Sequence, residues 1–235
     1  MITQEKLRRN LSSYLTRPTS GRPVLKSVIN QLLSDLPETV IFGGMIREFA
    51  IGNARSFTSD IDLVSLSPQA EIELAIRVFN PVVNKFGGFR FVINKQRFDI
   101  WSLERTWAFQ CGHVAGNSFV DLLKTTFFNL DAACYDVHKN QLYLLDRYVD
   151  DANGLRLDTN LLNNPNPRGM ARKALSYALN KNLRWSESLT EYVVRNIDAN
   201  EITWPERRVH SQAIKFLDSS ERSTFRFDPQ VEFGT

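Results

Sequence analysis

The residues best suited to chemistry are two aspartates, Asp60 and Asp62, at the start of an apolar run. Side chains at i and i+2 of a strand point to one face. In a strand over residues 60–65, both carboxylates would therefore face one point while Ile61 and Leu63 face a core. Neighbouring carboxylates repel each other, and a hard divalent cation such as Mg2+ relieves that repulsion with oxygen ligands. The pattern predicts a magnesium site, although an Asp-x-Asp pair alone is a weak signal.

A glycine pair, Gly43-Gly44, ends the preceding apolar run. Glycine lets the backbone turn sharply and come close to a ligand. If a helix starts at Met45, its first N–H groups face the turn and favour a phosphate, and Arg47 can add a bidentate contact. The order of strand, glycine turn, helix and Asp-x-Asp strand predicts a site for a metal and a triphosphate. Ser59 is a further candidate phosphate contact, although a solvated turn explains it equally well.

A third carboxylate, Asp99, interrupts the apolar segment 98–100. An unpaired charge is costly to bury, so we expect Asp99 to face the same edge as the two earlier aspartates. An exposed strand position is the alternative. The residues around it, 89–93 and 97–101, predict a hairpin with Asn94-Lys95-Gln96 as its connection.

These motifs resemble the nucleotidyltransferase superfamily that includes DNA polymerase β. Residues 43–47 (GGMIR) and 60–64 (DIDLV) are similar to the head domain of bacterial poly(A) polymerases and CCA-adding tRNA nucleotidyltransferases. Antibiotic and toxin-type nucleotidyltransferases carry a similar first motif. The resemblance implies an α+β fold, in which a mixed β-sheet, palm-like head with flanking helices is followed by a small helical C-terminal region.

Later segments favour the poly(A) and CCA-adding branch, whose patterns I-N-A-x-A-Y-D, L-I-D-P and L-R are similar to residues 129–136, 145–146 and 155–156. Three positions depart from that branch. Thr126 and Phe127 stand where the family has arginine and aspartate, and Asp131 stands where it has asparagine. The family uses that arginine and asparagine to hold the sugar and phosphates. An aspartate accepts but cannot donate hydrogen bonds and repels phosphate, which leaves nucleotide geometry, base preference and activity open.

The resemblance implies metal-dependent transfer of a nucleoside monophosphate from an NTP, ATP or CTP, to a hydroxyl. The implied acceptor is an RNA or tRNA 3′ end, and pyrophosphate is released. Asp60, Asp62 and Asp99 would hold two Mg2+ ions, and Asp99 would also take the proton of the attacking hydroxyl. The nucleotide would contact Gly43, Gly44, Arg47, Ser59, Asp131, Arg168, Arg172 and Lys173. The last three lie on a predicted neck-like helix over 166–182, where a solvated basic face explains them equally well.

Two other functions compete with this one. A compact toxin-type or defence-type nucleotidyltransferase could act on a protein or a small molecule. A catalytically degenerate module could bind nucleotide or RNA without turnover. The resemblance covers roughly residues 38–180, so we expect any RNA grip to be small or supplied by a protein partner or a second copy in a homodimer.

Composition sets wider bounds. The chain has 235 residues, a net charge of +3, two cysteines and three histidines. The mild charge permits a nucleic-acid partner without demanding one. We expect a cytoplasmic protein without a membrane segment and with two reduced thiols. We also expect N-terminal helices packed on the head (1–37), the head (38–160), a helical neck-like domain (161–220) and an extended tail (221–235).

Apolar periodicity predicts the individual elements. Helices are expected over residues 3–16, 22–36, 67–80, 119–128 and 166–182, and two more within 186–218. Strands are expected over residues 39–42, 60–65, 89–93, 97–101, 129–136 and 141–146. Ser67 is the expected N-cap of the helix that starts at Pro68.

Overall fold

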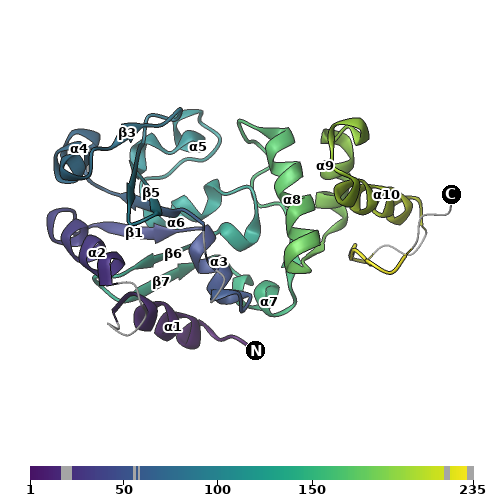
Figure 1. Ribbon diagram of the computed structural model, residues 1–235, viewed down its shortest axis with the longest axis horizontal. Coiled ribbons are helices and arrows are strands. Elements are labelled where there is room, and N and C mark those ends of the chain that lie inside the picture. The colour runs from purple at the N-terminus through teal and green to yellow at the C-terminus, as the bar shows by residue number, and fades with distance from the viewer. Residues whose placement is uncertain (17–22, 55–56, 58, 220–222, 232–235) are drawn as a thin grey trace. The chain divides into compact units, whose positions relative to one another are not determined.

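The computed structural model describes residues 1–16, 23–54, 57, 59–219 and 223–231 (Figure 1). The chain divides into two compact units. The first comprises Met1–Thr126 and Leu130–Asn153, and the second comprises Phe127–Asn129 and Gly154–Thr235.

The first unit is built on a seven-stranded sheet with the order β3-β4-β5-β2-β1-β6-β7. The strands are β1 (Thr39–Phe42), β2 (Ile61–Ser65), β3 (Val82–Val83), β4 (Phe89–Ile93), β5 (Gln96–Ser102), β6 (Ala133–Asp136) and β7 (Gln141–Leu144). Strands β2 and β5 are parallel, and the other neighbouring pairs are antiparallel. The sheet is therefore mixed, which confirms the predicted α+β class.

Short helices surround this sheet. They are α1 (Gln4–Thr16), α2 (Pro23–Asp35), α3 (Gly44–Ala50), α4 (Gln69–Ile76), α5 (Trp107–Gln110), α6 (Phe119–Leu122) and α7 (Tyr148–Asn153). Single 3-10 turns add η3 (Arg77–Phe79), η4 (Leu103–Arg105), η5 (Leu123–Thr125) and η6 (Asn129–Asp131). Helix α1 buries Leu7, Leu11 and Leu15, the stripe that its sequence predicts.

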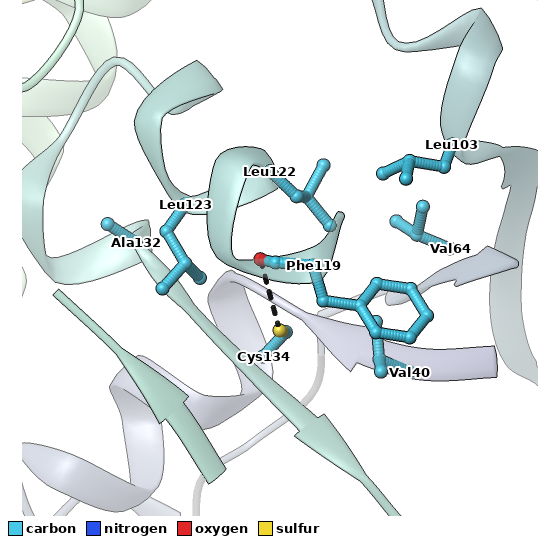
Figure 2. Packing of buried hydrophobic residues seen from close by; sticks show 8 residues of the cluster. All are labelled: Val40, Val64, Leu103, Phe119, Leu122, Leu123, Ala132 and Cys134. Atoms are coloured by element: carbon cyan, nitrogen blue, oxygen red, sulfur yellow. Dashed lines mark hydrogen bonds between the residues drawn. The ribbon is translucent and has the colours of Figure 1, made fainter. Parts of the chain in front are cut away.

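The central strands β1 and β2 are covered on both faces. On one face, Val40 and Val64 join an apolar cluster with residues of α6, η4 and η5 (Figure 2). The Sγ atom of Cys134 lies 3.8 Å from the carbonyl oxygen of Phe119 in this cluster. Because side chains alternate along a strand, the buried Ile41 faces the other side, where α3 contacts β1, β2 and β6. Both faces of the central sheet are therefore fixed by apolar packing.

The second unit is mainly helical, with α8 (Pro167–Lys181), α9 (Glu187–Asn196) and α10 (Trp204–Asp218) packed on one another. It also holds β8 (Arg156–Leu157) paired in parallel with β9 (Arg184–Trp185), and the 3-10 turn η7 (Ala199–Glu201). Helix α8 begins after Asn166, whose side chain accepts a hydrogen bond from the backbone N–H of Gly169. Thr203 and Glu206 form a capping box at the start of α10.

Several element boundaries differ from those that the sequence predicts. Helix α4 begins at Gln69 after Pro68, so Ser67 is not its N-cap. The helix expected over 119–128 is only α6 followed by the turn η5, and the expected strand over 129–136 begins with the turn η6. These segments are apolar enough for a longer helix or strand, but their packing on the sheet decides their form.

In helix α3, all six residues from Met45 to Ala50 are buried. Part of the expected C-terminal tail packs on the second unit. Phe225 is buried, with 3% of its surface exposed, and it forms an isolated β-bridge with Trp185. Phe233 falls outside the described residues.

The last two features of the fold concern its cysteines and the apolar character of its helices. Both cysteines are free thiols; Cys111 is exposed and Cys134 is buried. Within the described ranges, no helix combines the length and apolar character needed to cross a membrane.

Candidate active site

The glycine turn directly follows the central strand β1. The last residue of β1, Phe42, is the register partner of Asp62 on β2. Gly43 therefore follows the strand at a point beside the Asp-x-Asp pair. Gly43 has φ +68°, a left-handed conformation that L-residues with side chains adopt only with strain. Its N–H donates to the carbonyl oxygen of Ala133 at 2.9 Å, and its own carbonyl accepts from Ile46 at 3.0 Å. The turn is therefore fixed from both sides.

Asp62 and Asp99 are register partners on the parallel strands β2 and β5. Neighbouring strands lie about 4.8 Å apart, and partners in register carry their side chains to the same face. Asp60 comes just before β2, and its Oδ2 lies 3.6 Å from the Arg90 Nη2 that also pairs with Asp99, which places Asp60 on that face as well. The structure thus brings the three predicted carboxylates to one face of the sheet, and Asp99 is 8% exposed.

The carboxylates continue the same row of side chains that forms the apolar cluster. Val64 and Trp101 are register partners one step along β2 and β5 from Asp62 and Asp99. Trp101 packs against the cluster and meets Phe42 with a ring separation of 6.2 Å. The face therefore changes from apolar to acidic between the Val64–Trp101 pair and the Asp62–Asp99 pair.

Two arginines that the sequence analysis did not single out bind these carboxylates. Arg90 on β4 donates from Nε to Asp99 Oδ1 at 2.9 Å and from Nη2 to Asp99 Oδ2 at 2.7 Å. The same Nη2 lies 3.6 Å from Asp60 Oδ2. Arg97 donates from Nε to Asp60 Oδ1 at 2.6 Å. The hydrogen bond to Asp99 and the charges of Asp99, Asp60 and Asp62 raise the pKa of the Arg90 guanidinium.

The hairpin β4–β5 explains the position of Arg90. Its connection is Asn94 and Lys95, with φ values of +46° and +68°, so Gln96 already belongs to β5. The register makes Arg90 the direct partner of Asp99. The expected connection of Asn94-Lys95-Gln96 is one residue too long, and that difference would have turned Arg90 to the opposite face.

Arg47 lies inside the fold rather than at the surface of the turn. Its side chain is 4% exposed and forms ion pairs with Glu48, at 3.0 Å between Nη2 and Oε1, and with Asp131. Nearby, the Tyr148 hydroxyl donates to the Leu130 carbonyl at 3.1 Å, and burial raises the pKa of this phenol. The aspartate that departs from the family pattern is therefore the partner of Arg47.

The remaining candidate nucleotide contacts lie elsewhere. Ser59 is exposed, and its carbonyl oxygen accepts a hydrogen bond from Gln96 Nε2 at 2.9 Å. On α8 in the second unit, Arg168 and Arg172 both reach Glu201, through its carboxylate and its carbonyl oxygen respectively. Lys173 lies over the rings of Phe128 and Tyr177, at 5.8 and 5.7 Å from their centroids. These three basic residues contact other residues of the second unit.

The three carboxylates suit Mg2+ in kind, because it prefers oxygen ligands and is usually held through one or two carboxylates. Their present arrangement is that of an ion-pair network. Among the described residues, no three His, Cys, Asp or Glu side chains are gathered as a metal-binding group. A guanidinium nitrogen of Arg90 instead bridges Asp60 and Asp99. The carboxylate oxygens are suitable ligands for a divalent cation. In this structure they are paired with the Arg90 guanidinium instead.

Solved structures provide a comparison for this fold. A CCA-adding enzyme in complex with CTP matches 88% of this chain and 50% of its own, with a TM-score of 0.57 and 17% identity. The present chain therefore shares the fold of this CCA-adding enzyme. A Thermotoga maritima CCA-adding enzyme complexed with tRNA matches 88% of this chain and 49% of its own, with a TM-score of 0.56 and 17% identity.

A tRNA nucleotidyltransferase complexed with a primer tRNA and an incoming ATP analogue shares the nucleotidyltransferase fold, with a TM-score of 0.51 and 19% identity. The match covers 80% of this chain and 55% of that one, so the present chain spans about half the length of these structures. No family model and no curated protein matches the sequence. At these identities the likeness establishes the fold, which confirms the predicted resemblance at that level.

Proposed function

We propose that this chain is a nucleotidyltransferase that moves a nucleoside monophosphate from an NTP to a hydroxyl, with release of pyrophosphate. The observation that carries the proposal is the register pairing of Asp62 with Asp99, with Asp60 on the same face and the Gly43 turn beside them. The nucleotidyltransferase fold supports it. The CTP, the ATP analogue and the tRNA in the solved structures make ATP or CTP the proposed donor and a tRNA 3′ end the proposed acceptor.

In the proposed site, Asp60, Asp62 and Asp99 would hold Mg2+. Bound Mg2+ would supply charge neutralisation at the triphosphate and would acidify the attacking hydroxyl. Asp99 would accept the proton of that hydroxyl once its contact with Arg90 opens. The acceptor oxygen forms a bond to the α-phosphorus, the bond from that phosphorus to the bridging oxygen of the β-phosphate breaks, and pyrophosphate leaves with the electron pair.

Other parts of the chain would position the substrates. Gly43 and Gly44 leave room for the triphosphate to approach the backbone. Phe42 and Trp101, which pack on each other beside the carboxylates, would limit the access of water from that side. Arg47 and Asp131 would act on the nucleotide through their buried pair, and Ser59, Arg168, Arg172 and Lys173 remain proposed contacts.

The direct test is nucleotidyl transfer from α-labelled NTPs to total tRNA with trimmed 3′ ends and, separately, to whole lysate. The wild type should label RNA, and Asp62→Asn should not, while its circular dichroism spectrum stays unchanged. Asp35→Asn is the matched control, because Asp35 is exposed at the end of α2 in the same unit. Label on a protein or small molecule would reassign the acceptor. No labelled product under any condition would refute transfer.

One observation favours a second function, a nucleotide-binding or RNA-binding module without turnover. Asp60 and Asp99 form ion pairs with Arg90 and Arg97, and Arg47 forms ion pairs with Asp131 and Glu48. Such a module would bind tRNA or NTP and would bind them equally well after Asp62→Asn. Filter binding of the two proteins in the presence and absence of Mg2+ separates this function from catalysis.

A further inference from the structure

The carboxylate site contains its own cation. We infer that Arg90 is an internal counter-ion that competes with divalent cations for Asp60 and Asp99. A metal would therefore bind only as the guanidinium leaves. This inference rests on the proposed function, because it concerns the same carboxylates.

The geometry of Arg90 is that of a competitor for ligand oxygens. Its two hydrogen bonds to Asp99, at 2.9 and 2.7 Å, engage both carboxylate oxygens. Its Nη2 also lies 3.6 Å from Asp60 Oδ2. Paired N–H donors aligned with a carboxylate are among the strongest charge-assisted contacts in proteins. Asp99 therefore has no oxygen that is clear of the guanidinium.

The two partners differ in how readily they can move. The Asp99 side chain is 11% exposed and fixed by the central strand β5, whereas the Arg90 side chain is 43% exposed. Long arginine side chains keep their charged end near water and change rotamer without repacking a core. The guanidinium can therefore leave Asp99 for solvent, while the carboxylate stays in place to receive a cation.

Charge gives the competition its direction. Asp60, Asp62 and Asp99 together carry three negative charges, and Arg90 and Arg97 offset two of them. Loss of Arg90 removes both a steric occupant and a positive charge that repels any incoming cation. Because the guanidinium is partly exposed, solvent screens the contact, and we expect a gain in cation affinity of about tenfold rather than several orders of magnitude.

Arg97 provides a graded comparison. It makes one hydrogen bond, at 2.6 Å to Asp60, and its side chain is 57% exposed. Among the described residues it pairs with one carboxylate rather than two, so its removal should raise cation affinity less than removal of Arg90. Arg77 is exposed in the same unit and supplies a control of equal charge change away from these contacts.

The test measures Mn2+, an oxygen-preferring probe, by electron paramagnetic resonance of the free ion. Wild type, Arg90→Gln, Arg97→Gln and Arg77→Gln are titrated as folded proteins, checked by circular dichroism. We expect tighter binding for Arg90→Gln by about tenfold, a smaller gain for Arg97→Gln and no change for Arg77→Gln. The double variant Arg90→Gln/Asp62→Asn should lose the gain, which would place the bound ion at this site.

The outcomes separate the inference from the proposed function. Equal Mn2+ affinity in wild type and Arg90→Gln, or weaker binding in Arg90→Gln, would overturn the role of Arg90 and leave the metal site standing. Absence of Mn2+ binding in both folded proteins would overturn the metal site itself. A gain in Arg77→Gln equal to that of Arg90→Gln would show a general charge effect and would also defeat the inference.

Discussion

Asp62 and Asp99 lie side by side on β2 and β5, neighbouring parallel strands of the seven-stranded sheet. The chain between them runs through α4, η3, β3 and β4, which together form the crossover between β2 and β5. Parallel strands need such a crossover, and here it brings a second carboxylate to the level of the first. The acidic centre is thus a consequence of the topology.

This pairing predicts that the two carboxylates act as one unit in nucleotidyl transfer. Asp62→Asn and Asp99→Asn should each reduce the transfer rate at least about a hundredfold, because metal-bound charge stabilisation is worth several kcal/mol. Groups that act together are not additive, so the double variant should be no slower than the worse single variant. Single-turnover rates measure this. A double variant slower by the product of the two single effects would contradict the shared role.

The turn after β1 predicts different effects for two adjacent glycines. Gly43→Ala must hold φ at +68°, which costs about 1–2 kcal/mol for a residue with Cβ. Gly44→Ala is the matched control, because its Cβ would lie 3.5 Å from Arg47 Nη2, an ordinary contact. Urea denaturation should show a lower midpoint for Gly43→Ala alone. Equal loss in both variants would mean that crowding rather than backbone conformation governs the turn.

Much of this site could be predicted because its signals are local. Alternation along 60–65 places Asp60 and Asp62 together with no knowledge of the partner strand, and the apolar neighbours of Asp99 point it toward the same face. The glycines mark the end of β1 because few other residues accept a positive φ. The strands β1, β2, β4 and β5 fall within one residue of their expected bounds.

Local sequence patterns could not predict the contact between Arg90 and Asp99. Arg90 reaches Asp99 only in the register set by a connection of Asn94 and Lys95. A connection longer by one residue, as expected, turns the side chain to the other face of the sheet. The alternation of Phe89, Arg90 and Phe91 does indicate an outward arginine, but only the true turn length reveals its partner.

The pair of Arg47 and Asp131 shows a second limit. The two residues lie 84 positions apart, and no local pattern connects them. From sequence, Asp131 is recognisable only because it replaces the asparagine of the resembling nucleotidyltransferases. That replacement predicts that its carboxylate repels phosphate. The structure gives it a structural partner instead, since Arg47 is almost fully buried and requires a counter-charge.

Loss of Asp131 should therefore destabilise the first unit. Asp131→Ala removes one of the carboxylates that pair with the buried Arg47 guanidinium, and breaking a buried pair costs about 3 kcal/mol. Asp131→Asn retains a hydrogen-bond acceptor and should cost less. Urea denaturation of the first unit measures both. Asp146→Ala is the control, because Asp146 is exposed in the same unit, and an equal loss in this variant would argue against the buried pair.

The second unit should lose stability in mild acid through His210. This residue is 5% exposed on α10, and burial lowers the pKa of its ring. The unfolded chain binds the proton more readily, at the ordinary pKa of about 6.5. Stability is therefore complete above that pH and falls as the pH drops toward the lower folded pKa.

Hydrogen exchange of the α10 amides at pH 7.5 and pH 5.5, corrected for intrinsic rates, measures this loss. Wild type should lose protection at the lower pH, because charging a buried ring opens the contacts among α8, α9 and α10. His210→Phe keeps a buried ring without a titrating group, so its α10 protection should not depend on pH. His138→Gln removes an exposed histidine from the first unit and should behave as wild type. Equal α10 protection of the wild type at both pH values would show that the protonated ring is accommodated.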